Sequence, residues 1–100
     1  MRCRRCNPVP EEVRRAADLL ERRWTISILY ASYDGATRFN EFRQAVHGVS
    51  PRTLTERLRD LEAAGVLERR VVPASPPYAE YRLTERGRQL ARVVQALSSA

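Results

Sequence analysis

Residues 50–65, with the sequence SPRTLTERLRDLEAAG, carry the start and stop signals of a single helix. Ser50 is a good N-cap residue, and Pro51 suits the first helical position because its missing N–H costs nothing there. Gly65 suits the position that follows the last helical turn. The stretch therefore predicts a helix over residues 50–64.

The apolar residues of this helix fall on one side. At 3.6 residues per turn, three leucines lie within about 60° of one another, namely Leu54, Leu58 and Leu61. Burying each leucine contributes about 2 kcal/mol, which is enough in a small domain to fix the rotation of the helix. The side that carries the arginines must then face outward.

The outward side has the side chains that DNA-reading helices use. In the major groove arginine binds guanine and glutamate accepts from cytosine, each good pair contributing about 1–3 kcal/mol of discrimination, while helix N-termini favour phosphate. A solvated face is the alternative interpretation. The base-contact candidates are Arg52, Thr53 and Glu56, with Thr55 beside them, and the phosphate candidates are Ser50, Arg57 and Arg59. For Arg57, which lies nearer the leucine edge, pairing with Glu41 or Glu62 is the alternative.

The composition suits one DNA-binding domain. The chain has 100 residues, 43% of them hydrophobic, and a formal net charge of +6, which favours a polyanionic partner. All of the basic residues are arginine, so the choice of arginine at any one site carries little information. No apolar run is long enough to span a membrane and no secretory signal precedes the domain, which predicts a cytoplasmic, nucleoid-associated protein.

The remaining periodicity predicts a mainly helical chain with a small β-ribbon. Helices are expected over 11–22, 24–33, 39–46, 50–64 and 85–97, and antiparallel strands over 66–72 and 79–83. Three helices followed by a ribbon make a winged helix-turn-helix, here with an extra helix at each end. We expect a tail over 1–10 and one domain over 11–100, with the helix-turn-helix at 39–64, the wing at 66–83 and dimerisation helices at 11–22 and 85–97.

The wing and the start of the third helix supply further candidates for DNA contact. They are Arg38, Arg69, Arg70, Ser75 and Tyr78, the last two in a predicted tip over 75–78. Arg69 is equally well interpreted as a structural ion-pairing residue, and Glu80 as an acceptor inside the ribbon. The aromatic residues Trp24, Phe39 and Phe42 are expected in the core.

Two cysteines, Cys3 and Cys6, form a CxxC motif near the N-terminus. A structural zinc site needs about four ligands and His47 is the only histidine, so we expect no metal and no cofactor. The motif is consistent with an interchain disulfide, with a reactive thiol among arginines, or with two incidental thiols in a tail. We find no nucleophile–base pair and no phosphate-binding glycine loop, and therefore expect no enzyme.

Five motifs follow one another along the chain. They are Trp24-Thr25 with Ile28-Leu29, Gly35-x-x-Arg38-Phe39-x-Glu41, Val49-Ser50-x-x-x-Leu54-Thr55-x-Arg57-Leu58, Leu61-Glu62-x-x-Gly65-x-x-x-Arg69, and Pro77-x-x-Glu80-Tyr81-x-Leu83-Thr84-x-x-Gly87. In these motifs the chain closely resembles the HxlR-type winged helix-turn-helix transcriptional regulators. The resemblance implies a dimeric bacterial regulator of a pseudo-palindromic operator, dimerised through its terminal helices, and in some members an N-terminal cysteine that senses oxidants or electrophiles.

Two function classes follow from these observations. The first is a homodimeric repressor or activator that binds double-stranded DNA, because one winged module buries only about 600–1,000 Å² on DNA and a dimer presents two recognition helices. The second is a winged-helix module that binds another protein and no DNA.

Overall fold

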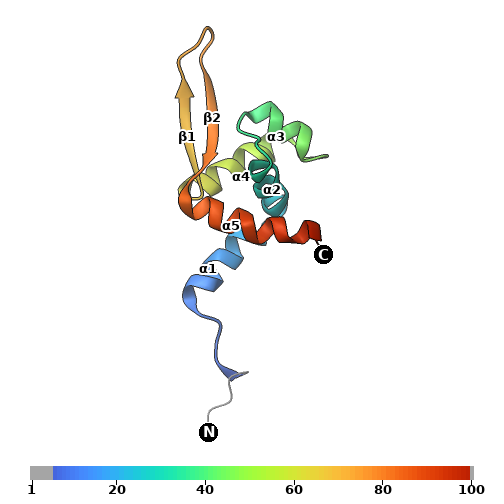
Figure 1. Ribbon diagram of the computed structural model, residues 1–100, viewed down its shortest axis with the longest axis vertical. Helices are drawn as coiled ribbons and strands as arrows, with labels where there is room; N and C mark the ends of the chain where they lie inside the picture. The colour runs from blue at the N-terminus through green and yellow to red at the C-terminus, as the bar shows by residue number, and fades with distance from the viewer. Residues whose placement is uncertain (1–5, 100) are drawn as a thin grey trace.

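The computed structural model describes residues 6–99, so Cys3 lies outside the described residues. The structure is mostly helical with one two-stranded antiparallel ribbon, and the predicted fold class is confirmed (Figure 1). Its elements are α1 (Glu11–Leu20), α2 (Thr25–Tyr33), α3 (Phe39–Ala45), α4 (Pro51–Ala63), β1 (Leu67–Val72), β2 (Tyr78–Leu83), α5 (Glu85–Gln95) and the 3-10 helix η2 (Ala96–Ser99).

Helix α4 packs its leucine side into the centre of the core, as predicted. Its three leucines, Leu54, Leu58 and Leu61, are fully buried, and they share one cluster with Ile28, Leu29 and Phe42. The Ser50 hydroxyl accepts a hydrogen bond from the Thr53 N–H at 3.1 Å, so the predicted cap is present. Both ends and the rotation of α4 therefore follow from its own sequence.

Helix α2 is buried on one side only, although its sequence is nearly apolar all round. Ile28 and Leu29 are fully buried, whereas Ile26 and Tyr33 have exposed fractions of 40% and 44%. No other element covers that second side within residues 6–99. Helix α2 is therefore a central helix with one exposed side.

The start of α2 is held against the turn between α3 and α4. Trp24 precedes the helix with a φ of 80°, a left-handed conformation that is rare outside glycine. A Cβ built on Gly48, whose φ is 91°, would lie 3.5 Å from the Trp24 ring. The tryptophan thus packs on the one residue of the turn that has no side chain, and it fixes the turn relative to α2.

The ribbon starts one residue earlier on its second strand than the sequence predicted. Tyr78 belongs to β2, opposite Val72, and the assignment of Tyr78 to the tip is wrong. The Tyr81 N–H donates to the Thr37 carbonyl at 2.7 Å, which attaches β2 to the segment before α3. This bond explains why the ribbon stands beside the helix pair.

Helix α5 is anchored where it follows the ribbon. The Thr84 hydroxyl accepts from the Gly87 N–H at 3.0 Å and donates to the Gly65 carbonyl at 2.6 Å. Gly87 is buried so close to Val66 that an added Cβ would lie 2.0 Å from the Val66 carbonyl oxygen. One threonine therefore caps α5 and joins it to the end of α4.

Two elements project from the body (Figure 1). The radius of gyration is 15.6 Å, against about 13 Å for a compact chain of this length. The ribbon projects at one end and α1 at the other, and no residue of α1 is buried. Helix α1 ends at Leu20 rather than at residue 22, and α5 ends at Gln95, where η2 begins.

We expect Gly87→Ala to destabilise the protein by about 1–3 kcal/mol, because the new methyl group overlaps the Val66 carbonyl and the backbone must shift. Urea unfolding followed by circular dichroism measures the loss. Gln89→Ala, an exposed change on the same helix, is the control and should alter stability by less than about 0.5 kcal/mol. Equal midpoints for the two variants would contradict the close approach.

Candidate nucleic-acid interface

Helices α3 and α4 form the expected helix-turn-helix, joined by residues 46–50. The turn needs Gly48 in its left-handed conformation, and it leads into the Ser50 cap of α4. Because the leucine side of α4 is buried, the helix presents its other side to solvent. This exposed side is the candidate surface for the major groove.

Arg52 and Glu56 lie together on this exposed side. The Arg52 side chain has an exposed fraction of 91%, and its Nε lies 3.4 Å from the Glu56 Oε1. Exposed pairs one turn apart contribute about 0.3–0.5 kcal/mol, so this pair opens at little cost. Arg59 is exposed one turn further along the helix. Three of the residues proposed for base or phosphate contact, Arg52, Glu56 and Arg59, are therefore accessible.

The small hydroxyl residues at the start of α4 are engaged with their own helix. The Ser50 hydroxyl donates to the Thr53 Oγ1 at 3.0 Å while it caps the Thr53 N–H. The Thr55 hydroxyl donates to the Pro51 carbonyl at 2.9 Å. These bonds stabilise the first turn, and DNA contact by Ser50, Thr53 and Thr55 stays a prediction.

Arg57 contacts neither Glu41 nor Glu62, the alternative partners considered from the sequence. Its Nε donates to the Arg23 carbonyl at 2.9 Å, and its Nη1 lies 3.4 Å from the Asp60 carboxylate. Arg22 approaches the same carboxylate at 2.9 Å. The side chain is only 20% exposed, so Arg57 joins α4 to the linker between α1 and α2, and phosphate contact by this residue stays a prediction.

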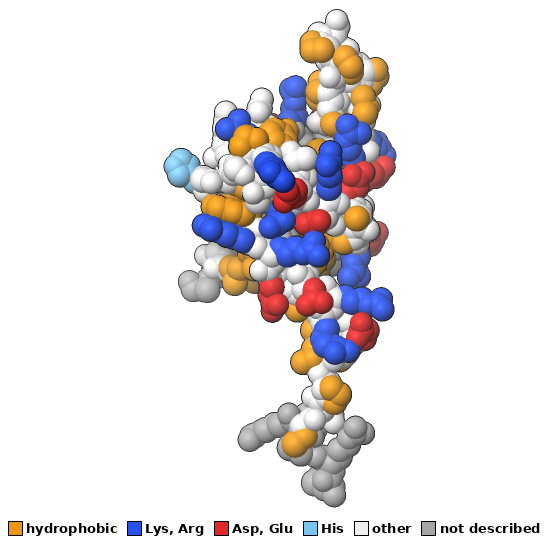
Figure 2. Space-filling model, turned by 180° about the vertical axis from the view of Figure 1, so that it is seen from behind, with side chains coloured by type: hydrophobic (Ala, Val, Ile, Leu, Met, Phe, Trp, Pro, Cys, Tyr) orange, Lys and Arg blue, Asp and Glu red, His pale blue; other side chains and the backbone are white. Residues whose placement is uncertain are grey.

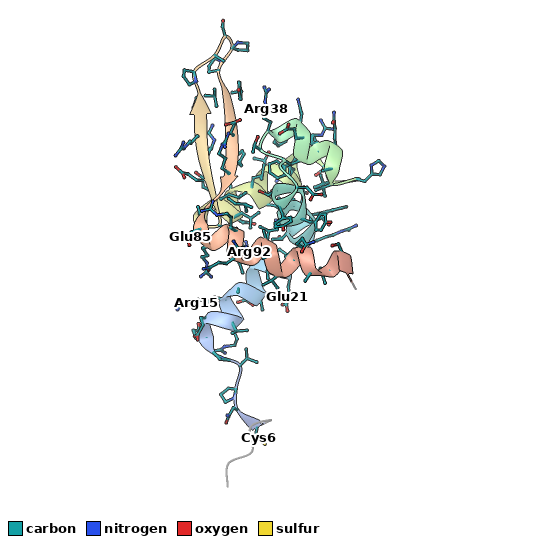
Figure 3. All side chains as sticks on the ribbon, viewed as in Figure 1. Cys6, Arg15, Glu21, Arg38, Glu85 and Arg92 are labelled. Atoms are coloured by element: carbon teal, nitrogen blue, oxygen red, sulfur yellow. The ribbon has the colours of Figure 1, made fainter. Side chains whose placement is uncertain are left out.

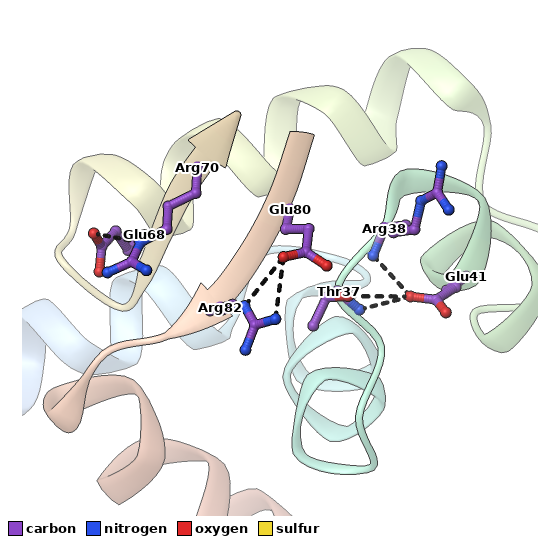
Figure 4. A network of polar contacts seen from close by, with 7 residues as sticks. All are labelled: Thr37, Arg38, Glu41, Glu68, Arg70, Glu80 and Arg82. Carbon is purple, nitrogen blue, oxygen red and sulfur yellow. Dashed lines mark hydrogen bonds and ion pairs between the residues drawn. The ribbon is translucent and has the colours of Figure 1, made fainter. Parts of the chain in front are cut away.

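The wing brings a second set of arginines beside the helix pair. The Arg38 guanidinium lies 3.8 Å from the centre of the Tyr78 ring, a cation–π contact between the start of α3 and β2. In the ribbon Arg70 pairs with Glu68 at 3.3 Å and Arg82 with Glu80 at 3.1 Å (Figure 4). Glu80 therefore accepts a bond inside the ribbon, as predicted.

Two further wing candidates are exposed. Arg69 lies opposite Tyr81, and the structure shows it in no ion pair with any residue from 6 to 99, which leaves its guanidinium open to a partner. Ser75 lies at the tip. Figure 2 shows how arginines and carboxylates intermingle on the face opposite to that of Figure 1. On this face, therefore, the positive charge does not form one continuous patch.

Glu41 is the residue whose role the sequence reasoning missed. One of its oxygens accepts from the backbone N–H groups of Thr37 and Arg38, each at 2.9 Å, and from the Thr37 hydroxyl at 3.3 Å (Figure 4). These bonds, with the nearby Arg38 charge, lower the pKa of Glu41 below its ordinary value near 4.5. A glutamate three residues after a helix start was the available signal.

Cys6 is exposed at the far end of the N-terminal segment, remote from Arg38 and the helix pair (Figure 3). Within residues 6–99 there is no group of three or more histidine, cysteine, aspartate or glutamate side chains suited to a metal ion. None of the helices in that range has the length and apolar character needed to cross a membrane.

Comparison with known proteins assigns the family. A sequence model described as HxlR-like helix-turn-helix matches residues 19–100. The chain belongs to the HxlR-like helix-turn-helix family. It is a transcriptional regulator of the winged-helix type, in agreement with the fold described above.

Individual HxlR-like relatives agree with this assignment. The HTH-type transcriptional regulator YvaP of Bacillus subtilis is 39% identical over 84% of this chain and 78% of its own length. The reduced form of the regulator YodB from B. subtilis superposes with a TM-score of 0.80 at 34% identity, over 92% of this chain and 90% of that one. The reduced form of the redox regulator HypR superposes with a TM-score of 0.78 at 38% sequence identity, over 89% of this chain and 88% of that one.

The lengths of these relatives differ from one to the next. The chain spans 63% of the regulator sll1512 from Synechocystis, to which it is 40% identical. All of these relatives are named as regulators and none as an enzyme.

We expect the hydrogen bonds of Glu41 to make stability depend on pH. Because its pKa is lower in the folded chain, the stabilisation is complete above the ordinary value near 4.5 and is lost as the pH falls through the folded value. Glu41→Gln should therefore lower the urea midpoint at pH 7. At pH 3 the difference in urea midpoint between the variant and the parent protein should be smaller.

The control for this experiment is Glu62→Gln, which removes an exposed carboxylate from α4. It makes the same change in net charge without touching the start of α3. If the urea midpoint of Glu41→Gln lies equally far below that of the parent protein at both pH values, the charge of the Glu41 carboxylate is not what stabilises this turn.

Proposed function

We propose that this protein is a homodimeric regulator that binds a pseudo-palindromic DNA operator through α4 in the major groove, with the wing on the backbone or in the minor groove. One observation carries the proposal. The leucine side of α4 is fully buried while Arg52 and Arg59 are exposed on its other side. Recognition helices dock in this orientation.

The arrangement of charges supports the same function. The chain carries a formal net charge of +6, and the arginines of α4 and the wing lie at two neighbouring parts of the molecule. Contacts from Arg38, Arg69 and Arg70 to phosphate would fix the position of the wing, and base contacts from α4 would supply specificity. A cytoplasmic location at the nucleoid is the corresponding proposal for the cell.

A second copy is proposed to cover α1 and the outer side of α5. Helix α1 has an apolar stripe but no buried residue, and Val13 on that stripe is half exposed. On the other helix Val93 is 66% exposed. A ten-residue helix is marginal on its own in water, so a projecting α1 is best stabilised by a partner's apolar surface.

A protein-binding winged helix without DNA contact is the competing function. Such a module would present acidic or apolar residues on the outer side of α4, whereas Arg52 and Arg59 lie there. A gel shift with random duplex at low salt separates the two classes, because non-specific DNA binding rests on phosphate contacts.

We expect Arg52→Ala and Arg59→Ala to weaken DNA binding in different ways. Loss of a base contact at Arg52 should relax preference at one operator position by about 1–3 kcal/mol. Loss of a phosphate contact at Arg59 should weaken binding to all duplexes alike. It should also reduce the slope of log affinity against log salt concentration by about one. Fluorescence anisotropy with operator and random duplexes, over a range of salt concentrations, measures both effects.

Arg15→Ala is the matched control, since it removes the same charge from α1, at the opposite end of the molecule from Arg38 (Figure 3). It should leave operator preference unchanged. A folded Arg52→Ala protein with unchanged affinity and selectivity would remove Arg52 from the interface.

A thiol response is the narrower part of the proposal. It is supported by the exposure of Cys6 ahead of α1 and by the similarity to YodB, whose diamide-treated form is known, and to the redox regulator HypR. A thiol on that segment lies near the proposed dimer surface, so oxidation would act on the assembly first.

We expect the reduced protein to sediment as a dimer at tens of micromolar, because α1 needs a partner surface. Diamide treatment should then add a covalently linked dimer on a non-reducing gel, and Cys6→Ser should reduce that product. Sedimentation of the reduced protein as a monomer would contradict the proposed dimer. A non-reducing gel that diamide treatment leaves unchanged would contradict the thiol response but not the dimer.

A further inference from the structure

A groove opens on the side of α2 that carries Ile26 and Tyr30. It lies between α2, α3 and the C-terminal end of α5 with η2, and its volume is about 680 Å³. Its apolar wall consists of Ile26, Tyr30, Val94 and Leu97. Ligand sites in proteins have volumes of about 300–1,000 Å³, so a small organic molecule fits this space.

The charged groups of the groove are all acidic. Asp34 and Glu41 line it, and none of its lining residues, all of which fall within residues 6–99, is basic. This is unexpected in a chain with a formal net charge of +6. The charge of the groove is therefore opposite to that of the protein as a whole.

Asp34 adds negative charge where the helix is already negative. It is the C-cap residue of α2, whose last turn contains no basic side chain. The carbonyl end of a helix carries about half a negative charge and favours a cation. Here the helix end and the Asp34 carboxylate lie together, so α2 itself provides no positive group to balance them.

Glu41 brings a second carboxylate to the same groove. Its hydrogen bonds to the backbone of Thr37 and Arg38 keep it ionised at neutral pH, and these bonds engage its Oε1. The ring of Tyr30 lies in the same lining, and aromatic faces attract organic cations. Two carboxylates, a helix C-terminus and an aromatic residue therefore line one groove together with its apolar wall.

We propose that this groove binds a small amphipathic organic cation, with its charged centre at Asp34 and Glu41 and its apolar body along Ile26, Tyr30, Val94 and Leu97. A neutral apolar molecule would leave the carboxylates unbalanced, and an anion would be repelled. Because Glu41 also fixes the start of α3, a ligand held there acts on the helix pair that faces DNA. The proposal concerns ligand binding and does not depend on the operator.

The test uses two ions of the same shape and opposite charge, tetraphenylphosphonium and tetraphenylborate, titrated into the full-length protein by calorimetry in potassium-free buffer. We expect saturable binding of one tetraphenylphosphonium per chain and no binding of tetraphenylborate at this site. Non-specific attraction to a protein of charge +6 would give the reverse preference. Preference for the anion, or no saturable binding of the cation, would overturn the proposal.

Variants locate the site. Asp34→Asn should weaken cation binding about three- to five-fold, since the lost interaction is an exposed ion pair, and Ala45→Phe should abolish binding by filling the groove. Glu62→Gln, outside the groove, is the control and should bind as the parent protein does. Unchanged binding in both groove variants, or groove occupation by the arginine-rich first residues of a second copy that blocks the probe, would overturn the assignment.

Discussion

The burial of three leucines on α4 is the interaction on which the rest of the structure depends. Leu54, Leu58 and Leu61 are fully buried against α2 and α3, and a helix with leucines at this spacing has one favourable rotation. Each contributes about 2 kcal/mol, which is large against the net stability of a small domain. The direction in which the arginines of α4 point is therefore a consequence of core packing.

Polar and aromatic contacts then fix what surrounds α4. The Trp24 ring packs on the glycine of the turn before the helix, and Thr84 joins the residue after the helix to α5. The carboxylate of Asp60, on α4 itself, forms ion pairs with Arg57 of the same helix and with Arg22 of the linker after α1. The linker that follows the proposed dimerisation helix is thus connected to the proposed recognition helix through one carboxylate.

Local features were predictable from the sequence, and long-range partners were not. The cap, the leucine stripe and the glycine stop of α4 depend on residues within one helix, so periodicity and cap preferences predicted them. The partner of Arg57 depends on which backbone comes near its long side chain, and the sequence suggested Glu41 or Glu62 instead of the Arg23 carbonyl. Likewise the apolar sequence of α2 does not show which of its side chains stay exposed, as Ile26 and Tyr33 do.

The arginines divide into two groups by the kind of contact that they make in the free protein. In the first group, which includes two of the arginines proposed to meet DNA, the partners are local: Arg52 pairs with Glu56 one turn away, and Arg70 with Glu68 on the same strand. Such exposed pairs contribute about 0.2–1 kcal/mol and open easily. Arg57 and Arg22 instead meet one partly buried carboxylate from different elements. Breaking that cluster would loosen α4 from the linker, so these two arginines stabilise the fold.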